Sequence, residues 1–492
     1  MALKTGQEYI DSLRELKPQV YAFGKRIENP RDHPLIRPHV NCAAQTYDLA
    51  FDPHHGRLAT VTSHLTGKPI NRFTHIHRST EDLLNKVKML RLLGQRTGSC
   101  FQRCVGFDAL NALYITTFEM DRDLGTGYHS RFRRFLTWVQ ENDLMCAGAM
   151  TDPKGDRSLA PSQQADPDLY LRVTEKNGSG IVVRGAKMHQ TGAVNAHQLV
   201  VMPTIGMRPD DEAYAVAFAT QVDAPGITMI FGRQTNDSRR LEGCIDQGNP
   251  HFGSVGGEAL VVFEDVFVPW ERVFMCGEIA YTGTLVERFA SLHRQNYGGC
   301  KTGLADVLIG ATRALAEYNG VLNASHVKDK LVEMVHLAES LYAGSLACSA
   351  EGRPTPSGAY YVDGLLANVT KLNVTRNVYE IVRLAQDIAG GLIATMPSEQ
   401  DFQDPEIGPL VQKYLKGTAS VPAEHRYRIA RLIENMTGGT ALVESMHGAG
   451  SPQAERIMIL RQANLDQKKQ LALRLAGVTP LDAPVGSPHS RP

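Results

Sequence analysis

The segment Gly180-Ile-Val-Val-Arg-Gly-Ala-Lys-Met-His-Gln-Thr-Gly192 begins with one of several short β-branched runs found between residues 165 and 275. Turn residues such as Asn177-Gly178 and Ala224-Pro-Gly226 separate the runs, a pattern typical of strands joined by short loops. The predicted strands cover residues 169–173, 180–183, 199–202, 215–218, 228–231, 259–263 and 266–268. We expect them to form a β barrel or sandwich inserted between helical regions.

The regions on either side have helical periodicity. Ser79-Thr-Glu-Asp82 resembles a capping box and begins an amphipathic run. The other strong helix predictions cover residues 302–318, 326–350, 364–386 and 422–435. The sequence therefore predicts an α+β protein. Its parts are an N-terminal helical domain (1–145), a middle β domain (146–280), a C-terminal helix bundle (281–478) and a disordered tail (479–492).

Composition excludes several broad classes of function. The 492 residues carry 52 basic and 52 acidic side chains, for a formal net charge of +0. This balance argues against nucleic acid and anionic membranes as partners and favours a small molecule. The N-terminus lacks the apolar core of a signal peptide, and no window is apolar enough for a membrane span. We expect a cytoplasmic protein whose eight cysteines do not form a disulfide framework.

Three cysteines and one histidine stand out as candidate ligands. Cys100 and Cys104 are four residues apart, and His293 and Cys300 are seven apart, spacings that place side chains on one face of a helix. Together they make a four-donor set for a metal ion or an iron–sulfur cluster, and structural zinc fits the same donors. Packing of buried cysteines is the simpler alternative. Gly94 and Gly98, just before the pair, fit either a helix break or a close approach.

Two further motifs carry a family resemblance. Met150-Thr-Asp-Pro-Lys-Gly-Asp-Arg157 and Gly185-Ala-Lys-Met-His-Gln-Thr-Gly-Ala193 resemble the flavin-binding middle domain of the 4-hydroxyphenylacetate 3-monooxygenase superfamily, which has the acyl-CoA dehydrogenase-like layout of helices, β domain and helix bundle. The added cysteine and histidine donors resemble one branch of that superfamily, the 4-hydroxybutyryl-CoA dehydratase/vinylacetyl-CoA Δ-isomerases.

This resemblance implies a homotetrameric enzyme that acts on an acyl-CoA. It implies FAD and a [4Fe-4S] cluster held by Cys100, Cys104, Cys300 and His293. The implied reaction is dehydration of 4-hydroxybutyryl-CoA to crotonyl-CoA by a flavin radical mechanism, with the cluster as Lewis acid and vinylacetyl-CoA Δ-isomerase activity alongside. A neutral imidazole donor in place of a thiolate makes such a cluster less negative.

The resemblance also places the flavin contacts. In the middle domain they are Thr151, Asp152, Pro153, Lys154, Gly155, Gln190 and Thr191. A second group, near the end of a bundle helix, is Gln386, Asp387, Gly390 and Gly391, a turn that in acyl-CoA dehydrogenases often serves a neighbouring subunit. Its glycines permit close approach of the backbone to a pyrophosphate.

Acid–base residues are expected where the family has them: His293, Tyr297, Lys301, Glu258 and Glu455. A helix would stack His293, Tyr297 and Lys301 on one face. Burial near a flavin would raise the pKa of either carboxylate toward a value suited to proton transfer. Gln102, between the two cysteines, is a further candidate contact.

Two other functions compete with the dehydratase. A flavin-dependent aromatic hydroxylase of the 4-hydroxyphenylacetate 3-monooxygenase type has the same fold but needs no cluster ligands. A zinc-stabilised acyl-CoA-binding protein without catalysis is the third hypothesis.

Overall fold

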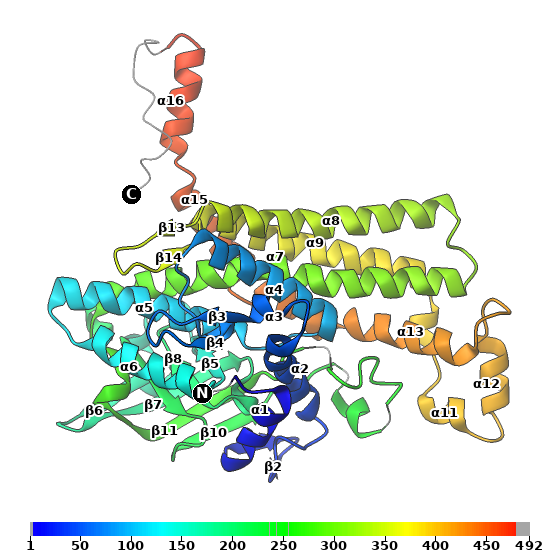
Figure 1. The fold of residues 1–492 in the computed structure, drawn as a ribbon, viewed down its shortest axis with the longest axis horizontal. Coiled ribbons are helices and arrows are strands. Elements are labelled where there is room, and N and C mark those ends of the chain that lie inside the picture. Colours follow the sequence, from blue (N-terminus) through cyan, green and yellow to red (C-terminus); the bar gives the residue numbers. More distant parts are fainter. Residues whose placement is uncertain (1–2, 236, 243, 254, 479–492) are drawn as a thin grey trace.

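The computed structural model describes residues 3–478 except 236, 243 and 254. Its elements follow the expected order of helices, strands and helices (Figure 1). The tail predicted at residues 479–492 lies outside the described residues.

The N-terminal region is mainly helical but contributes two strands to the middle sheet. Its elements are α1 (Gly6–Ser12), β1 (Gln19–Ala22), β2 (Lys25–Ile27), α2 (Arg37–Asp48), α3 (Gly56–Ala59), β3 (Thr60–Thr62), β4 (Pro69–Asn71), α4 (Thr80–Thr97), α5 (Cys104–Leu124) and α6 (Tyr128–Glu141). The predicted cap is confirmed, since the Ser79 side chain accepts from the Asp82 N–H at the start of α4.

The middle region is a β sandwich. Its strands are β5 (Cys146–Ala149), β6 (Arg172–Lys176), β7 (Gly180–Gln190), β8 (Gln198–Val201), β9 (Val216–Gln221), β10 (Ile227–Phe231), β11 (Ala259–Pro269) and β12 (Val273–Cys276). In the described part of the chain one sheet has the order β2-β1-β10-β11-β7-β6 and a second the order β12-β9-β8-β5. Phe218 and Phe263 meet between the sheets, with ring centroids 6.1 Å apart.

Most strand predictions are confirmed, with two corrections. The runs at 259–263 and 266–268 belong to one strand, β11, because an irregularity between Phe263 and Val266 shifts its register against β7 without ending it. The run at 169–173 starts too early: a 3₁₀ turn, Pro167–Leu169, precedes β6, and the Asp166 side chain caps that turn.

The C-terminal region is a helix bundle with an arm. Its elements are α7 (Ile279–Tyr318), α8 (Ser325–Ala350), β13 (Arg353–Pro354), β14 (Tyr360–Tyr361), α9 (Gly364–Ala389), α10 (Leu392–Thr395), α11 (Glu399–Gln403), α12 (Gly408–Leu415), α13 (Ala423–Met436), α14 (Gly439–His447), α15 (Pro452–Gln462) and α16 (Leu465–Leu475). Helices α7, α8 and α9 lie side by side, and α16 projects away from the rest (Figure 1).

Glycines allow α4 and α7 to pack almost backbone to backbone. A Cβ added at Gly94 would lie 2.8 Å from the Cys300 carbonyl oxygen and 3.1 Å from the Gly303 Cα. At Gly299 it would lie 2.8 Å from the Val87 carbonyl. Since real Cβ atoms do not approach that closely, glycine is required at this crossing. Gly94 therefore serves helix packing, and Gly98, with φ +58°, ends α4.

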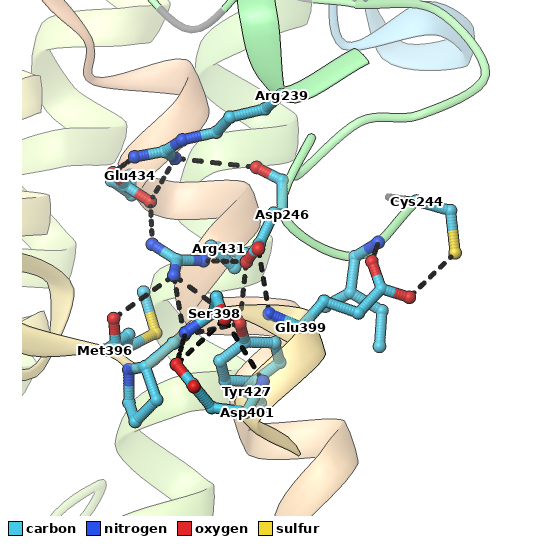
Figure 2. A network of polar contacts seen from close by, with 12 residues as sticks. Arg239, Cys244, Asp246, Met396, Ser398, Glu399, Asp401, Tyr427, Arg431 and Glu434 are labelled. Atoms are coloured by element: carbon cyan, nitrogen blue, oxygen red, sulfur yellow. Dashed lines mark hydrogen bonds and ion pairs between the residues drawn. The ribbon is translucent and has the colours of Figure 1, made fainter. Parts of the chain in front are cut away.

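The long segment between β10 and β11 is fastened to the C-terminal helices by buried charges. Asp246 accepts hydrogen bonds from Arg431 (2.9 Å), from the Tyr427 hydroxyl (2.7 Å) and from the Glu399 N–H (2.8 Å). Arg431 also binds Glu434 (2.6 Å), as Figure 2 shows. This network holds the segment that leads to Glu258 against α11 and α13.

Asp246→Asn should therefore destabilise the fold. The change weakens three hydrogen bonds and leaves the Arg431 charge less well compensated, at a cost of about 2–4 kcal/mol. Thermal unfolding measures it. Asp329→Asn, at an exposed position of α8, is the matched control and should change stability by less than about 0.5 kcal/mol. Equal midpoints for the two variants would contradict the role given to Asp246.

Candidate active site

Cys100, Cys104 and Cys300 gather where α4, α5 and α7 meet. Burial, with repulsion from a neighbouring cysteine in each case, raises the pKa of Cys100 and Cys104 well above its usual range. Burial also raises the pKa of Cys300 to about 12. The prediction that Cys100 and Cys104 share one helix face is wrong: α4 ends at Thr97, and α5 begins only at Cys104. Cys100 lies in the loop between them.

His293 is presented by α7 with one ring nitrogen already engaged. Its Nδ1 lies 2.8 Å from Asp108 Oδ2. Asp108 is fully buried and also accepts from Lys86 (2.5 Å) and Asn296 (2.5 Å). Burial alone would raise the pKa of Asp108, but the Lys86 charge and the His293 contact more than offset it and hold the pKa low. Such a carboxylate fixes a histidine so that Nε2 faces a ligand.

Tyr297 and Lys301 follow at one-turn intervals on α7, as predicted, and share an acceptor. Glu444 of α14 accepts from the Tyr297 hydroxyl (3.2 Å) and forms an ion pair with Lys301. Cys100, Lys301 and Glu444 line one cavity, whose other walls are mostly apolar side chains of α7, α9, α13 and α14. Sequence analysis missed Glu444, Asp108 and Lys86. Each is a single charged residue in a helix, without a motif.

Glu258 is half-buried at the end of the segment that Asp246 holds against the C-terminal helices. Its carboxylate accepts from Gln234 Nε2 (3.2 Å) and Thr191 Oγ1 (3.4 Å). Burial, with repulsion from Glu444, raises the pKa of Glu258 to about 8. Gln102 lies close by: its Nε2 donates to the His39 carbonyl (3.2 Å), and its Oε1 has no partner among the described residues.

Glu455 is fully buried near the start of α15, and neither carboxylate oxygen has a hydrogen-bond partner in the described part of the chain. Arg294 Nε lies 3.8 Å from Oε1 and also donates to the Ala449 carbonyl (3.0 Å). Burial raises the pKa of Glu455 to about 7, although Lys371 and Arg294 lower it in part. A buried carboxyl with unused oxygens and such a pKa is suited to accept a proton.

The predicted flavin contacts of the middle region lie together, but some of them form hydrogen bonds or ion pairs within the protein. The Thr151 carbonyl accepts from the Met188 N–H (2.7 Å) and from Gln190 Nε2 (3.2 Å), which joins residues 151–155 to residues 190 and 191. Asp152 forms a buried ion pair with Lys187 (2.9 Å). Its carboxylate is therefore occupied within the protein.

Lys154 and Gly155 complete that loop with positive φ angles of 73° and 46°. The second predicted group lies elsewhere, at the end of α9. Gln386 and Asp387 are exposed there, and Asp387 pairs with Lys330 (2.7 Å). Gly390 ends α9 with φ +68°.

The described residues contain neither a compact metal-binding group of side chains nor a membrane-spanning helix. Among residues 3–478, with 236, 243 and 254 left out, no group of three His, Cys, Asp or Glu side chains is placed to hold a metal ion. In the same residues no helix is both long and apolar enough to cross a membrane.

Comparison with known proteins places this site in a family. Residues 5–275 match the family model described as 4-hydroxyphenylacetate 3-hydroxylase N terminal, and residues 282–477 match the C-terminal model of the same hydroxylase. The chain belongs to the 4-hydroxyphenylacetate 3-hydroxylase family. The family resemblance seen in residues 150–157 and 185–193 is confirmed.

Individual relatives divide into two groups. The 4-hydroxybutyryl-CoA dehydratase/vinylacetyl-CoA-Δ-isomerase of Clostridium aminobutyricum is 56% identical, over 97% of this chain and 100% of that protein. The 4-hydroxyphenylacetate 3-monooxygenase oxygenase component of Thermus thermophilus is 27% identical, over 88% of each. The solved structure of an oxygen-tolerant 4-hydroxybutyryl-CoA dehydratase from N. maritimus superposes with a TM-score of 0.95 at 53% identity, covering 97% of this chain and 96% of that one.

These comparisons confirm the α+β fold of helices, β domain and helix bundle.

The pKa of Glu258 allows a test of the site by the pH dependence of stability. Its folded-state pKa of about 8 lies above the ordinary 4.5. Between those values the folded protein holds a proton that the unfolded chain has lost, so stability falls as pH rises.

Glu258→Gln should remove that dependence, which amounts to about 1.4 kcal/mol per pH unit. Thermal midpoints measured from pH 5 to pH 8 should fall less steeply for the variant than for the wild type. Parallel curves would mean that Glu258 is ionised in the folded protein.

Proposed function

We propose that this chain dehydrates 4-hydroxybutyryl-CoA to crotonyl-CoA and isomerises vinylacetyl-CoA. One structural observation carries the proposal. Three thiols and a carboxylate-bound histidine, from segments almost two hundred residues apart, lie beside the half-buried acids Glu258 and Glu444. An aromatic hydroxylase would not need these donors. The 56% identity to a relative named for both activities supports the same function.

The donor set fits an iron–sulfur cluster. Cys100, Cys104 and Cys300 supply thiol sulfur, and His293 keeps Nε2 for a ligand because Nδ1 is bound to Asp108. Cluster ligands bind different irons, so they need not converge on one point as ligands of a single ion do. We propose Cys100, Cys104, Cys300 and His293 as the ligands of a [4Fe-4S] cluster.

FAD is proposed for the loop 151–155 with Gln190 and Thr191, since a solved relative of this fold is described as complexed with FAD. When bound, the flavin would supply one-electron chemistry and the cluster a Lewis-acidic iron for a leaving hydroxyl.

The protein's own groups would handle the protons. The net reaction removes one proton from C2 and one from C3, returns one proton to C4, and releases the C4 hydroxyl with the other proton as water. Only the C2 hydrogen is activated by the thioester. Glu455 can accept a proton at either free carboxylate oxygen, because its pKa of about 7 matches neutral pH. Glu258, with its higher pKa, holds a proton on its carboxyl under the same conditions and can donate it. His293, Tyr297 and Lys301 complete the proposed acid–base set.

The proposed assembly is a homotetramer. Helix α16 presents Leu465, Leu471 and Leu475 to solvent, with 53%, 38% and 82% of their surface exposed, on an arm that projects from the body (Figure 1). The exposed turn at Gly390-Gly391 fits the predicted contact with the flavin of a neighbouring subunit. The domain boundaries and the cytoplasmic location stay predictions.

The first test measures the iron and flavin content of the protein and its turnover on the same sample. Protein purified without oxygen should contain about four irons and one flavin per chain and form crotonyl-CoA from 4-hydroxybutyryl-CoA. Cys300→Ala should lose iron and reduce turnover by more than about 100-fold. Cys276→Ala, on β12, is the matched control and should keep both. Flavin without iron, and without turnover, would favour the hydroxylase.

A second test concerns Glu455. Glu455→Gln keeps the shape of the side chain but removes its capacity to accept a proton, so kcat should fall by about 10²–10⁴-fold. Flavin and iron content should not change. Glu333→Gln, on the exposed face of α8, should retain wild-type kcat. Full activity in Glu455→Gln would remove this residue from the proton-transfer scheme.

A further inference from the structure

Tyr297 and Lys301 on α7 direct their polar ends at the same carboxylate. Glu444 Oε1 lies 3.2 Å from the Tyr297 hydroxyl, and Oε2 pairs with the Lys301 ammonium. Only 7% of the Lys301 side chain is exposed, against 23% for Glu444. One acceptor from α14 thus fixes two donors that lie one turn apart on another helix.

The carboxylate of Glu444 lies at the thiol site, defined as the place where Cys100, Cys104 and Cys300 gather. Glu444, Lys301 and Cys100 line the same cavity, in which most other side chains are apolar. In such surroundings a hydrogen bond to a charged group is strong, and a charge left unpaired is costly. The donors therefore have one favourable direction for their polar ends, which is set by Glu444.

Helix α14 is joined to α7 and α9 by polar contacts. Lys371 of α9 is fully buried and donates to the carbonyls of Ser445 (3.1 Å) and Met446 (3.0 Å), which belong to the last turn of α14. The same ammonium lies 4.8 Å from the centre of the Tyr297 ring. A Cβ at Gly448 would collide with the Tyr297 hydroxyl. Both the acceptor and the ring are thereby confined to one position.

We propose that Glu444 is a positioning residue that fixes the Tyr297 hydroxyl and the Lys301 ammonium for the substrate bound at the thiol site. The inference rests on the proposed dehydratase function and adds to it a residue of α14. Glu444 acts through its two partners, so its effect on turnover depends on their presence. A carboxylate that merely stabilised the fold would affect turnover equally with or without them.

The experiment compares Glu444→Gln in two backgrounds, the wild type and Lys301→Met, in protein loaded with flavin and iron. Gln has one acceptor oxygen in place of two and no negative charge, so it cannot reproduce both the Tyr297 contact at Oε1 and the Lys301 ion pair at Oε2. In the wild type we expect kcat to fall by about 10–100-fold, with KM for 4-hydroxybutyryl-CoA within about threefold and flavin and iron content unchanged. In Lys301→Met the same substitution should lower kcat by a factor at least about five times smaller.

The double variant also guards against a folding defect. Lys301→Met/Glu444→Gln removes both members of the ion pair, so its thermal midpoint should exceed that of Glu444→Gln alone. Glu317→Gln is the matched control, because Glu317 pairs with Arg313 at an exposed position of α7, outside the site. Its kcat should stay within about twofold of wild type.

The failures are distinguishable. Equal kcat losses in the two backgrounds, or a Glu444→Gln protein with wild-type kcat, would overturn the positioning role alone. A wild-type protein that holds flavin and iron but forms no crotonyl-CoA would overturn the proposed function and this inference with it.

Discussion

The contact between α4 and α7 is the constraint on which the site depends. Gly94, Gly299 and Gly303 remove the side chains that would hold the two helices apart. The crossing then sets Cys300 of α7 against the loop that carries Cys100. Any side chain at these positions would separate the helices and the cysteines together, so the packing that builds the core also brings together the proposed cluster ligands.

The second feature of the site is a polar interior in which most charged side chains form an ion pair. Lys86 neutralises Asp108, Lys301 neutralises Glu444 and Lys187 neutralises Asp152. Removing one member of such a pair costs about 3–5 kcal/mol, because the other stays buried and unpaired. Glu455 differs, since its oxygens lack hydrogen bonds in the described structure and its nearest cation is 3.8 Å away. A carboxylate in this state has both oxygens available for the proton transfer proposed for Glu455.

The sequence predicted the fold well because its signals were local. The Ser79 cap, the β-branched runs and the helical spacing of His293, Tyr297, Lys301 and Cys300 all act within a few residues, and the structure confirms them. Glu444, Asp108 and Lys371 were missed because their roles exist only across helices, where no spacing rule applies. Cys100 was misplaced because Gly98 ends the helix just before it.

The pairing of β1 with β10 has a consequence for biosynthesis. Val20 lies in β1, fully buried, and pairs in parallel with Met229, which is made about two hundred residues later. At roughly 5–20 residues per second, the ribosome takes on the order of 10–40 s to supply that partner. Until then the nascent chain has an unsatisfied strand edge near its beginning, open to wrong pairing. Slower translation therefore lengthens the time during which β1 lacks its partner strand and is exposed to aggregation.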